Sequence, residues 1–188
     1  MSSDSAPDVL GPLVGWRYWR LDPVSGLLSS LSRAQVWEPG NRFTAGCRLA
    51  RHWLTDSRYR ITGGVPHAED DVPGNHCTCG VYAARDLRHL RGQMLFGLGL
   101  TVVGEVSLWG KVIPGSSGYR AEHAYPRHLF AVRRTADWNK EQLVDSLRVY
   151  GVPVETINYK DAGFHPLAFI HALLSKARMF GRPSVSPR

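Results

Sequence analysis

The alternation of apolar and polar positions across residues 13–156 predicts a β-rich core domain. Short runs in which apolar or aromatic residues alternate with polar ones are typical of strands, and turn residues separate these runs. The clearest run is 101–113, which is rich in β-branched and aromatic residues and lies between Gly99 and Pro114-Gly115. Further strands are predicted at 13–22, 27–31, 34–37, 46–54, 119–125 and 128–134, with a turn and a short strand within 77–83.

Three segments carry helical patterns. Residues 86–94 and 137–150 each begin with an Asp that can cap a helix, and in the second segment apolar residues recur on one face until Gly151. Residues 164–180 are amphipathic, with Pro166 in the first turn. We therefore expect an α+β fold, with a curved antiparallel sheet or partly open β-barrel and two to three helices, the main ones C-terminal.

The two ends of the chain differ in composition from the core. Residues 1–12 are rich in Ser, Asp and Pro and lack the basic and apolar regions of a secretion signal, so we expect a disordered lead. We expect 157–180 to hold a helix packed on the core and 181–188 to be a tail. No apolar run approaches the roughly 20 residues that span a bilayer. Both observations favour a cytoplasmic protein.

The sharpest chemical feature is the segment 77–80, with the sequence Cys-Thr-Cys-Gly. Two thiolates at this spacing can bind one metal ion, and the glycine lets the backbone turn so that both sulfurs point inward. Structural zinc takes four ligands. Cys47 is a candidate for the third, and His67, in the loop that leads to this segment, is preferred to His52 or His76 for the fourth. The predicted metal site therefore consists of Cys47, His67, Cys77 and Cys79. An alternative stays open, in which these are three buried thiols beside surface histidines, because free Cys is among the most buried residue types.

Charge and aromatic content suggest a second kind of site. The formal net charge is +7, and most of the basic residues are arginines. A basic surface can bind phosphates through counterion release, and aromatic rings beside arginines can stack the bases of single-stranded nucleic acid. The candidate ligand-binding residues are Trp16, Trp19, Trp109, Tyr119, Arg120, Glu122, His123 and Tyr125. The arginines are scattered, however, and most aromatic residues in a domain of this size belong to its core.

Several motifs together resemble small uncharacterised proteins of actinobacteria and their phages. The resemblance covers residues 14–155 and rests on W-R-Y-W at 16–19, Cys47, C-T-C-G-V-Y-A at 77–83, G-E-V-S-L-W-G at 104–110, Y-R-A-E at 119–122, A-Y-P at 124–126 and Y-G-V-P at 150–153. It implies a bacterial cytoplasmic setting and a GC-rich genome as the source of the arginine bias. It implies no activity and no catalytic residue.

The sequence shows no pairing of a nucleophile with a base, which favours a non-enzymatic binding module and leaves the question of an enzyme open. In this interpretation a structural zinc knuckle supports a basic aromatic face, and nucleic acid is the first candidate partner. One alternative is a small-ligand receptor or enzyme with a pocket around Arg120, Glu122 and His123. Another is an assembly adaptor that contacts itself or a partner protein through 164–180.

Overall fold

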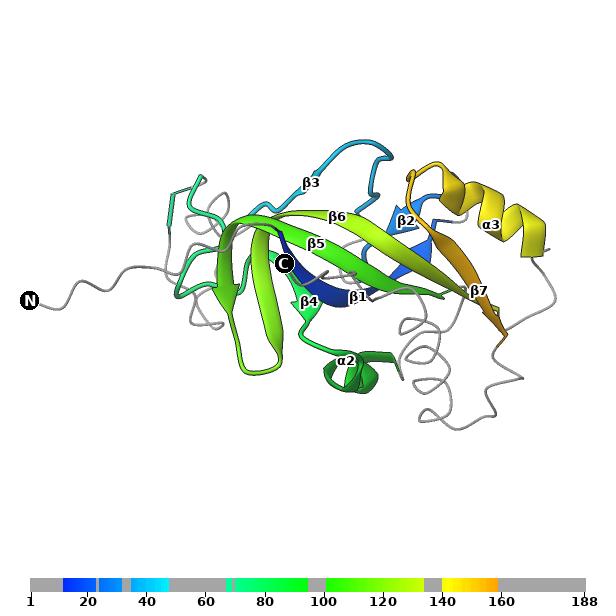
Figure 1. Cartoon of the computed structure of the whole chain (residues 1–188). Helices are drawn as coiled ribbons and strands as arrows, with labels where there is room; N and C mark the ends of the chain where they lie inside the picture. The colour runs from blue at the N-terminus through cyan, green and yellow to red at the C-terminus, as the bar shows by residue number, and fades with distance from the viewer. Residues whose placement is uncertain are drawn as a thin grey trace, which may run out of the picture.

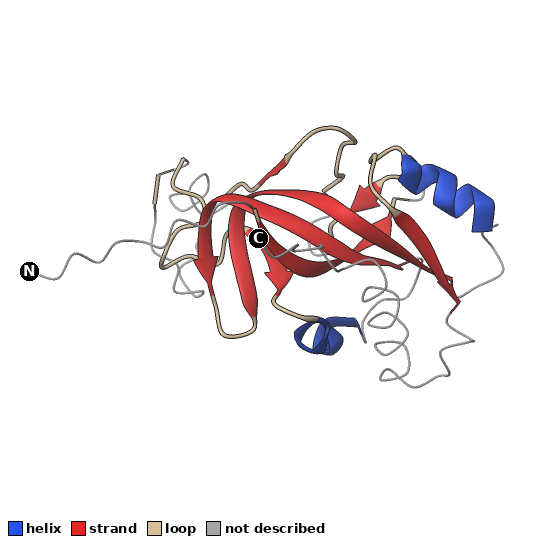
Figure 2. Cartoon of the chain, in the orientation of Figure 1, coloured by secondary structure: helices blue, strands red, loops and turns tan. Residues whose placement is uncertain are grey.

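The computed structural model describes residues 12–22, 24–31, 35–47, 67–68, 70–94, 101–133 and 140–158. Strands dominate these residues, and two helices accompany them (Figure 1 and Figure 2). In chain order the elements are β1 (Leu13–Leu21), β2 (Leu28–Ser29), β3 (Phe43–Thr44), β4 (Val81–Ala84), α2 (Leu87–Met94), β5 (Thr101–Pro114), β6 (Gly118–Arg133), α3 (Lys140–Arg148) and β7 (Val154–Asn158).

The seven strands of the described residues belong to one curved sheet. The long β5–β6 hairpin forms its middle, β1 pairs antiparallel with β5, and β2 returns from β1 as a short hairpin. Beside β6 lie β3 and β4, and β4 also reaches β1 at the single pair Trp16↔Ala84. The expected strand-rich, curved sheet is thus present. It is a mixed sheet rather than a purely antiparallel one, because β7 runs parallel to β6.

The strand β6 runs straight through Pro126, where the sequence pattern had predicted an end. The pairing with β5 shifts at this point, so that Val106 faces Pro126 and Glu105 faces His128. Arg127 is the extra residue of a β-bulge, and its side chain is exposed. A proline lacks the N–H that a regular ladder needs, and a bulge is one of the places in a sheet that tolerates it. The predicted strands 119–125 and 128–134 are therefore one strand.

Contrary to the prediction from the sequence, the described helices do not lie mainly at the C-terminal end of the fold. The prediction for 86–94 is confirmed by α2, which Asp86 caps by accepting hydrogen bonds from the backbone N–H groups of Arg88 and His89 at 2.9 and 3.0 Å. However, α2 precedes β5, and α3 is followed by β7, so the described helices are not C-terminal. The predicted helix 164–180 and most of the predicted strand 46–54 lie outside the described residues, and β3 lies earlier, at 43–44.

The main core lies against one face of the sheet and is closed by α3. The ring of Trp19 meets that of Trp37 edge to face, with 5.4 Å between the ring centroids. Leu143 and Leu147 of α3 are fully buried, as the helical pattern predicted. Tyr150, just after α3, donates its hydroxyl proton to the carbonyl of Trp37 at 2.6 Å and accepts the N–H of Leu28 at 2.8 Å. Burial raises the pKa of this phenol to about 12, so it stays protonated.

We predict that Tyr150→Phe lowers the free energy of unfolding by about 1–3 kcal/mol, because it leaves a buried N–H and a buried carbonyl unpaired. Urea denaturation followed by tryptophan fluorescence measures the change. Val149→Ala is the matched control, since Val149 is 52% exposed and should alter the stability little. Equal stability of Tyr150→Phe and the wild type would contradict the prediction.

Candidate metal centre

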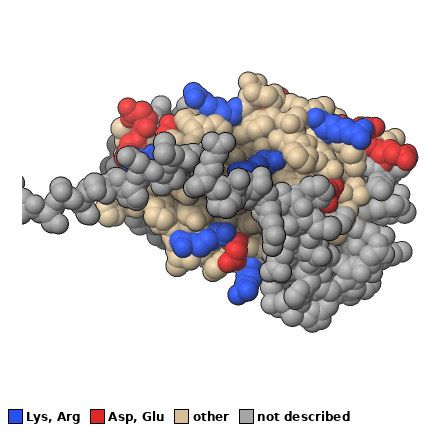
Figure 3. Space-filling model, viewed as in Figure 1, with Lys and Arg blue, Asp and Glu red and all other residues tan. Residues whose placement is uncertain are grey.

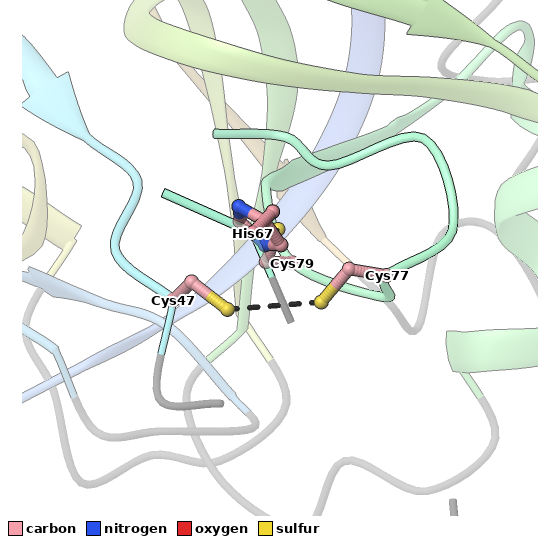
Figure 4. Close-up of side chains that lie close together, drawn as sticks. All are labelled: Cys47, His67, Cys77 and Cys79. Atoms are coloured by element: carbon pink, nitrogen blue, oxygen red, sulfur yellow. Dashed lines mark hydrogen bonds between the residues drawn. The ribbon is translucent and has the colours of Figure 1, made fainter. Parts of the chain in front are cut away.

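The four predicted metal ligands come from three separate segments. Cys47 follows β3, His67 lies in the segment before the Cys77–Gly80 turn, and this turn leads directly into β4. Residues 67–68 and 70–80 lie at the end of the sheet away from α3 and β7 (Figure 1). Figure 4 shows the four side chains directed toward one another. The fold therefore brings together groups that are far apart in the sequence.

The distances within this cluster suit a tetrahedral zinc ion. Sγ of Cys47 lies 3.7 Å from Sγ of Cys77, and Sγ of Cys79 lies 3.3 Å from Nε2 of His67. All four ligand atoms lie within 4.8 Å of one another. Tetrahedral zinc with Zn–S bonds of about 2.3 Å places two sulfurs about 3.8 Å apart. The three cysteines are buried and form no disulfide.

The Cys77–Gly80 turn is held by hydrogen bonds to Gly74 and by a glycine with positive φ. The N–H of Cys77 donates to the carbonyl of Gly74 at 3.2 Å, and the N–H of Gly74 donates to Sγ of Cys79 at 3.2 Å. Gly80 has φ +119°, a conformation that side chains disfavour. The predicted role of this glycine is confirmed, because its backbone makes the turn that other residues would strain.

His67 is oriented as a metal ligand should be. Its Nδ1 lies 2.9 Å from the carbonyl oxygen of Ala68, which accepts a hydrogen bond when Nδ1 carries the proton. In that tautomer Nε2 presents its lone pair to the sulfurs, and metal-bound histidines are commonly fixed in this way. A Cβ atom on Gly74 would lie 2.5 Å from Cδ2 of His67, so the ring needs a glycine beside it. The competing candidate His76 is exposed, and His52 lies outside the described residues.

The sequence suggested Arg120 as a ligand-binding residue. In the structure its side chain is hydrogen-bonded to the backbone of the metal centre. Its Nη1 donates to the carbonyls of Gly74, Cys77 and Cys79, with distances of 3.3 Å to the first and 3.0 Å to the last. The β4–β6 pairing Tyr82↔Arg120 puts the guanidinium there. Three thiolates and one Zn²⁺ would carry a net charge of −1, which this cation balances. No pattern within one segment points to this role, because it depends on the register between two strands.

The two cysteines of the turn differ in acidity. Burial, together with the neighbouring sulfurs, raises the pKa of Cys79 to about 11. Burial also opposes ionisation of Cys77, but hydrogen bonds to its sulfur, with that from the Cys79 backbone the largest, outweigh it and hold the pKa of Cys77 below its ordinary value. A metal ion would have to displace at least the Cys79 proton, so metal binding should release protons and weaken in acid.

Two other candidate ligand-binding residues on β6, Glu122 and His123, contact each other and neighbouring strands. Nε2 of His123 lies 3.2 Å from Oε1 of Glu122, and its Nδ1 lies 3.2 Å from Oγ1 of Thr44. Oε2 of Glu122 accepts the backbone N–H of Lys111 at 3.1 Å. The His123 side chain is only 13% exposed. Since Arg120 is bonded to the knuckle, it does not converge with Glu122 and His123 on a common ligand.

The aromatic candidates are dispersed. Trp19 is fully buried in the core, so its ring offers no stacking surface. Trp16 stacks on Phe130, Trp109 lies beside His123, and Tyr125 donates its hydroxyl proton to the carbonyl of Tyr150 at 3.0 Å. The remaining candidates, Tyr119 and Arg120, line a cavity described below.

Basic side chains do not gather into one patch on the face seen in Figure 3, where several lie beside acidic ones. Lys111 pairs with Asp71, and Arg148 pairs with Asp145 at 2.9 Å. Binding to nucleic acid therefore stays a prediction from composition. Among the described helices, neither has the length and apolar character that crossing a membrane requires.

Comparisons of this chain with protein-family models, curated proteins and solved structures gave no match.

We predict that Arg120→Met weakens the binding of added zinc to the four-residue cluster by about 10–100-fold, the usual effect of removing a group that orients metal ligands. Competition with a chromophoric chelator measures the affinity. Arg127→Met is the matched control, since Arg127 lies on the same strand, is exposed, and approaches Glu105 no closer than 4.0 Å. Equal affinity of the two variants would show that Arg120 does not support the centre.

Proposed function

We propose that this chain is a non-enzymatic interaction module in which one zinc ion, held by Cys47, His67, Cys77 and Cys79, is structural. The observation that carries this proposal is the convergence of three buried sulfurs and one correctly oriented imidazole nitrogen within 4.8 Å. Sulfur and imidazole ligands in a tetrahedral arrangement favour zinc among the common metals. The donor set belongs to the Cys₃His class of structural sites.

The ligand number supports a structural role. A catalytic zinc has three protein ligands and an open position for water, whereas this cluster supplies four. A catalytic zinc also benefits from a nearby carboxylate that acts as a base. Of the two described carboxylates in the same segment, that of Asp70 is exposed and that of Asp71 is hydrogen-bonded to Lys111, which lowers the pKa of Asp71. These features favour a centre that holds the fold together.

The architecture around the cluster shows what a zinc ion would stabilise. The apolar residues here form a small cluster separate from the main core, with Val72 beside the three cysteines. The adjoining strands β3 and β4 have only two and four residues. Strands this short bury little surface, so a cross-link between segments 30 residues apart adds stability that packing does not supply. We infer that zinc fixes this end of the sheet as a rigid surface for a partner.

The first test is the metal content of the purified chain, measured by elemental analysis. We expect one zinc per chain in the wild type and loss of zinc in Cys77→Ser and Cys79→Ser, because a hydroxyl does not replace a thiolate ligand. Thr78→Ala is the matched control, since the exposed Thr78 lies between the two cysteines and is not in the cluster. A wild-type chain that is folded and free of metal would overturn the proposal.

A second test separates a structural site from a catalytic one. We expect removal of zinc by a chelator to lower the thermal midpoint and to broaden the amide spectrum of residues 67–84, because metal binding and folding are coupled in such sites. Replacement of zinc by cobalt should give the absorption of a tetrahedral thiolate complex that does not respond to added anions. A cobalt spectrum that shifts when cyanide or azide is added would indicate an open position and contradict a structural role.

A further inference from the structure

Arg17 of β1 is a half-buried cation without an acidic partner among the described residues. Its Nη1 donates to the carbonyl of Tyr82 and its Nη2 donates to Oγ of Ser30 at 3.2 Å. Its Nε is buried and has no hydrogen-bond partner. Among the described residues no carboxylate forms an ion pair with it. A donor that is removed from water normally has a partner, so the buried Nε leaves this half-buried guanidinium with an unmet hydrogen bond as well as an uncompensated charge.

The neutral groups around Arg17 do not compensate its charge. The hydroxyl oxygen of Ser30 also accepts the indole N–H of Trp37 at 2.9 Å, so its capacity to accept is shared. The Trp37 ring centroid lies 5.3 Å from Cζ of Arg17, a cation–π contact that is weaker than an ion pair. Desolvation dominates the balance and lowers the pKa of Arg17 to about 10.

A cavity of about 570 Å³ adjoins this guanidinium. It lies where β1 and β4 diverge, since these strands pair only at Trp16↔Ala84. Its volume falls in the range of small-molecule pockets, which span about 300–1,000 Å³. The residues that line it are both aromatic and polar, among them Trp16, Arg17, Tyr18, Ser30, Gln35 and Phe43.

We propose that this cavity binds a small amphipathic anion whose carboxylate or phosphate group pairs with Arg17 and whose apolar body lies against the aromatic rings. Two of the five N–H donors of Arg17 have partners in the structure, and a guanidinium is suited to bind either oxyanion through two parallel hydrogen bonds. If Arg17 served only to link β1 to Ser30 and Tyr82 by hydrogen bonds, neither its positive charge nor the cavity beside it would be required. The four metal ligands do not line the cavity, although Arg120 and neighbours of the ligands such as Thr78 and Gly80 do, so the cavity adjoins the metal centre without including it.

Three probes with the same body test the proposal on the zinc-loaded full chain. They are 1-naphthoate, 1-naphthyl phosphate and the neutral 1-naphthol, with binding measured by calorimetry at low ionic strength. We expect at least one anion to bind about tenfold or more tightly than 1-naphthol, since a charged hydrogen bond to a half-buried guanidinium adds affinity. The anion that binds more tightly identifies the headgroup. Failure of all three to bind, or equal affinity of the neutral probe, would overturn the proposal.

Variants of Arg17 and Gln35 test whether the anion binds beside Arg17. Arg17→Met should abolish the advantage of the anions over 1-naphthol, and Arg17→Lys should keep part of it, because lysine retains the charge without the planar fork. Gln35 lines the cavity and is exposed, so its replacement leaves Arg17 and the core intact. Gln35→Glu should weaken and Gln35→Lys strengthen anion binding, with no change for 1-naphthol. Anion binding that is the same in both Gln35 variants, or an advantage that survives in Arg17→Met, would refute the site.

Discussion

The backbone hydrogen bonds of β6 are the interaction on which the rest of the fold depends. This strand pairs with β5 along most of its length on one side and with β4, β3 and β7 in succession on the other. Its neighbours on that second side are short and come from distant parts of the chain. They could not form a stable sheet by themselves, because short strands bury too little surface. The position of the metal cluster follows, since two of the segments that carry its ligands adjoin β3 and β4.

Two arginines illustrate how the same side chain is used differently within this sheet. Arg120 donates to three backbone carbonyls beside a cluster of thiols, so a metal-thiolate centre would balance its charge. Arg17 donates to one carbonyl and one hydroxyl and has no such anionic neighbour among the described residues. Even partial burial of a charge without a counterion is costly, and groups held in this state commonly mark sites where a ligand completes the pairing. The contrast supports a structural role for one residue and a binding role for the other.

Much of the local structure could be predicted from the sequence. The β1–β2 hairpin, the capped helix α2, the strand β5 and the buried face of α3 were all predicted, because each depends on alternation, capping or turn residues within a few positions. The same reasoning placed a strand end at Pro126, where it failed. A proline ends a strand only if the partner strand requires its N–H, and the bulge opposite Val106 removes that requirement. Strand partners are long-range information that a single pattern does not contain.

For the candidate site, too, some features could be predicted from the sequence and others depend on the tertiary structure. The Cys-Thr-Cys-Gly motif and the conformation of Gly80 were determined by the sequence itself, since a pair of thiols two residues apart needs a turn between them and the following strand. Only the tertiary structure decided that Cys47 and His67 complete the cluster, that Arg120 encloses it, and that Arg17 faces a cavity without a counterion. The physical reason is that chelation and charge compensation act over a few ångströms in space. Residues 30 or more positions apart reach that distance only when the sheet has set their register.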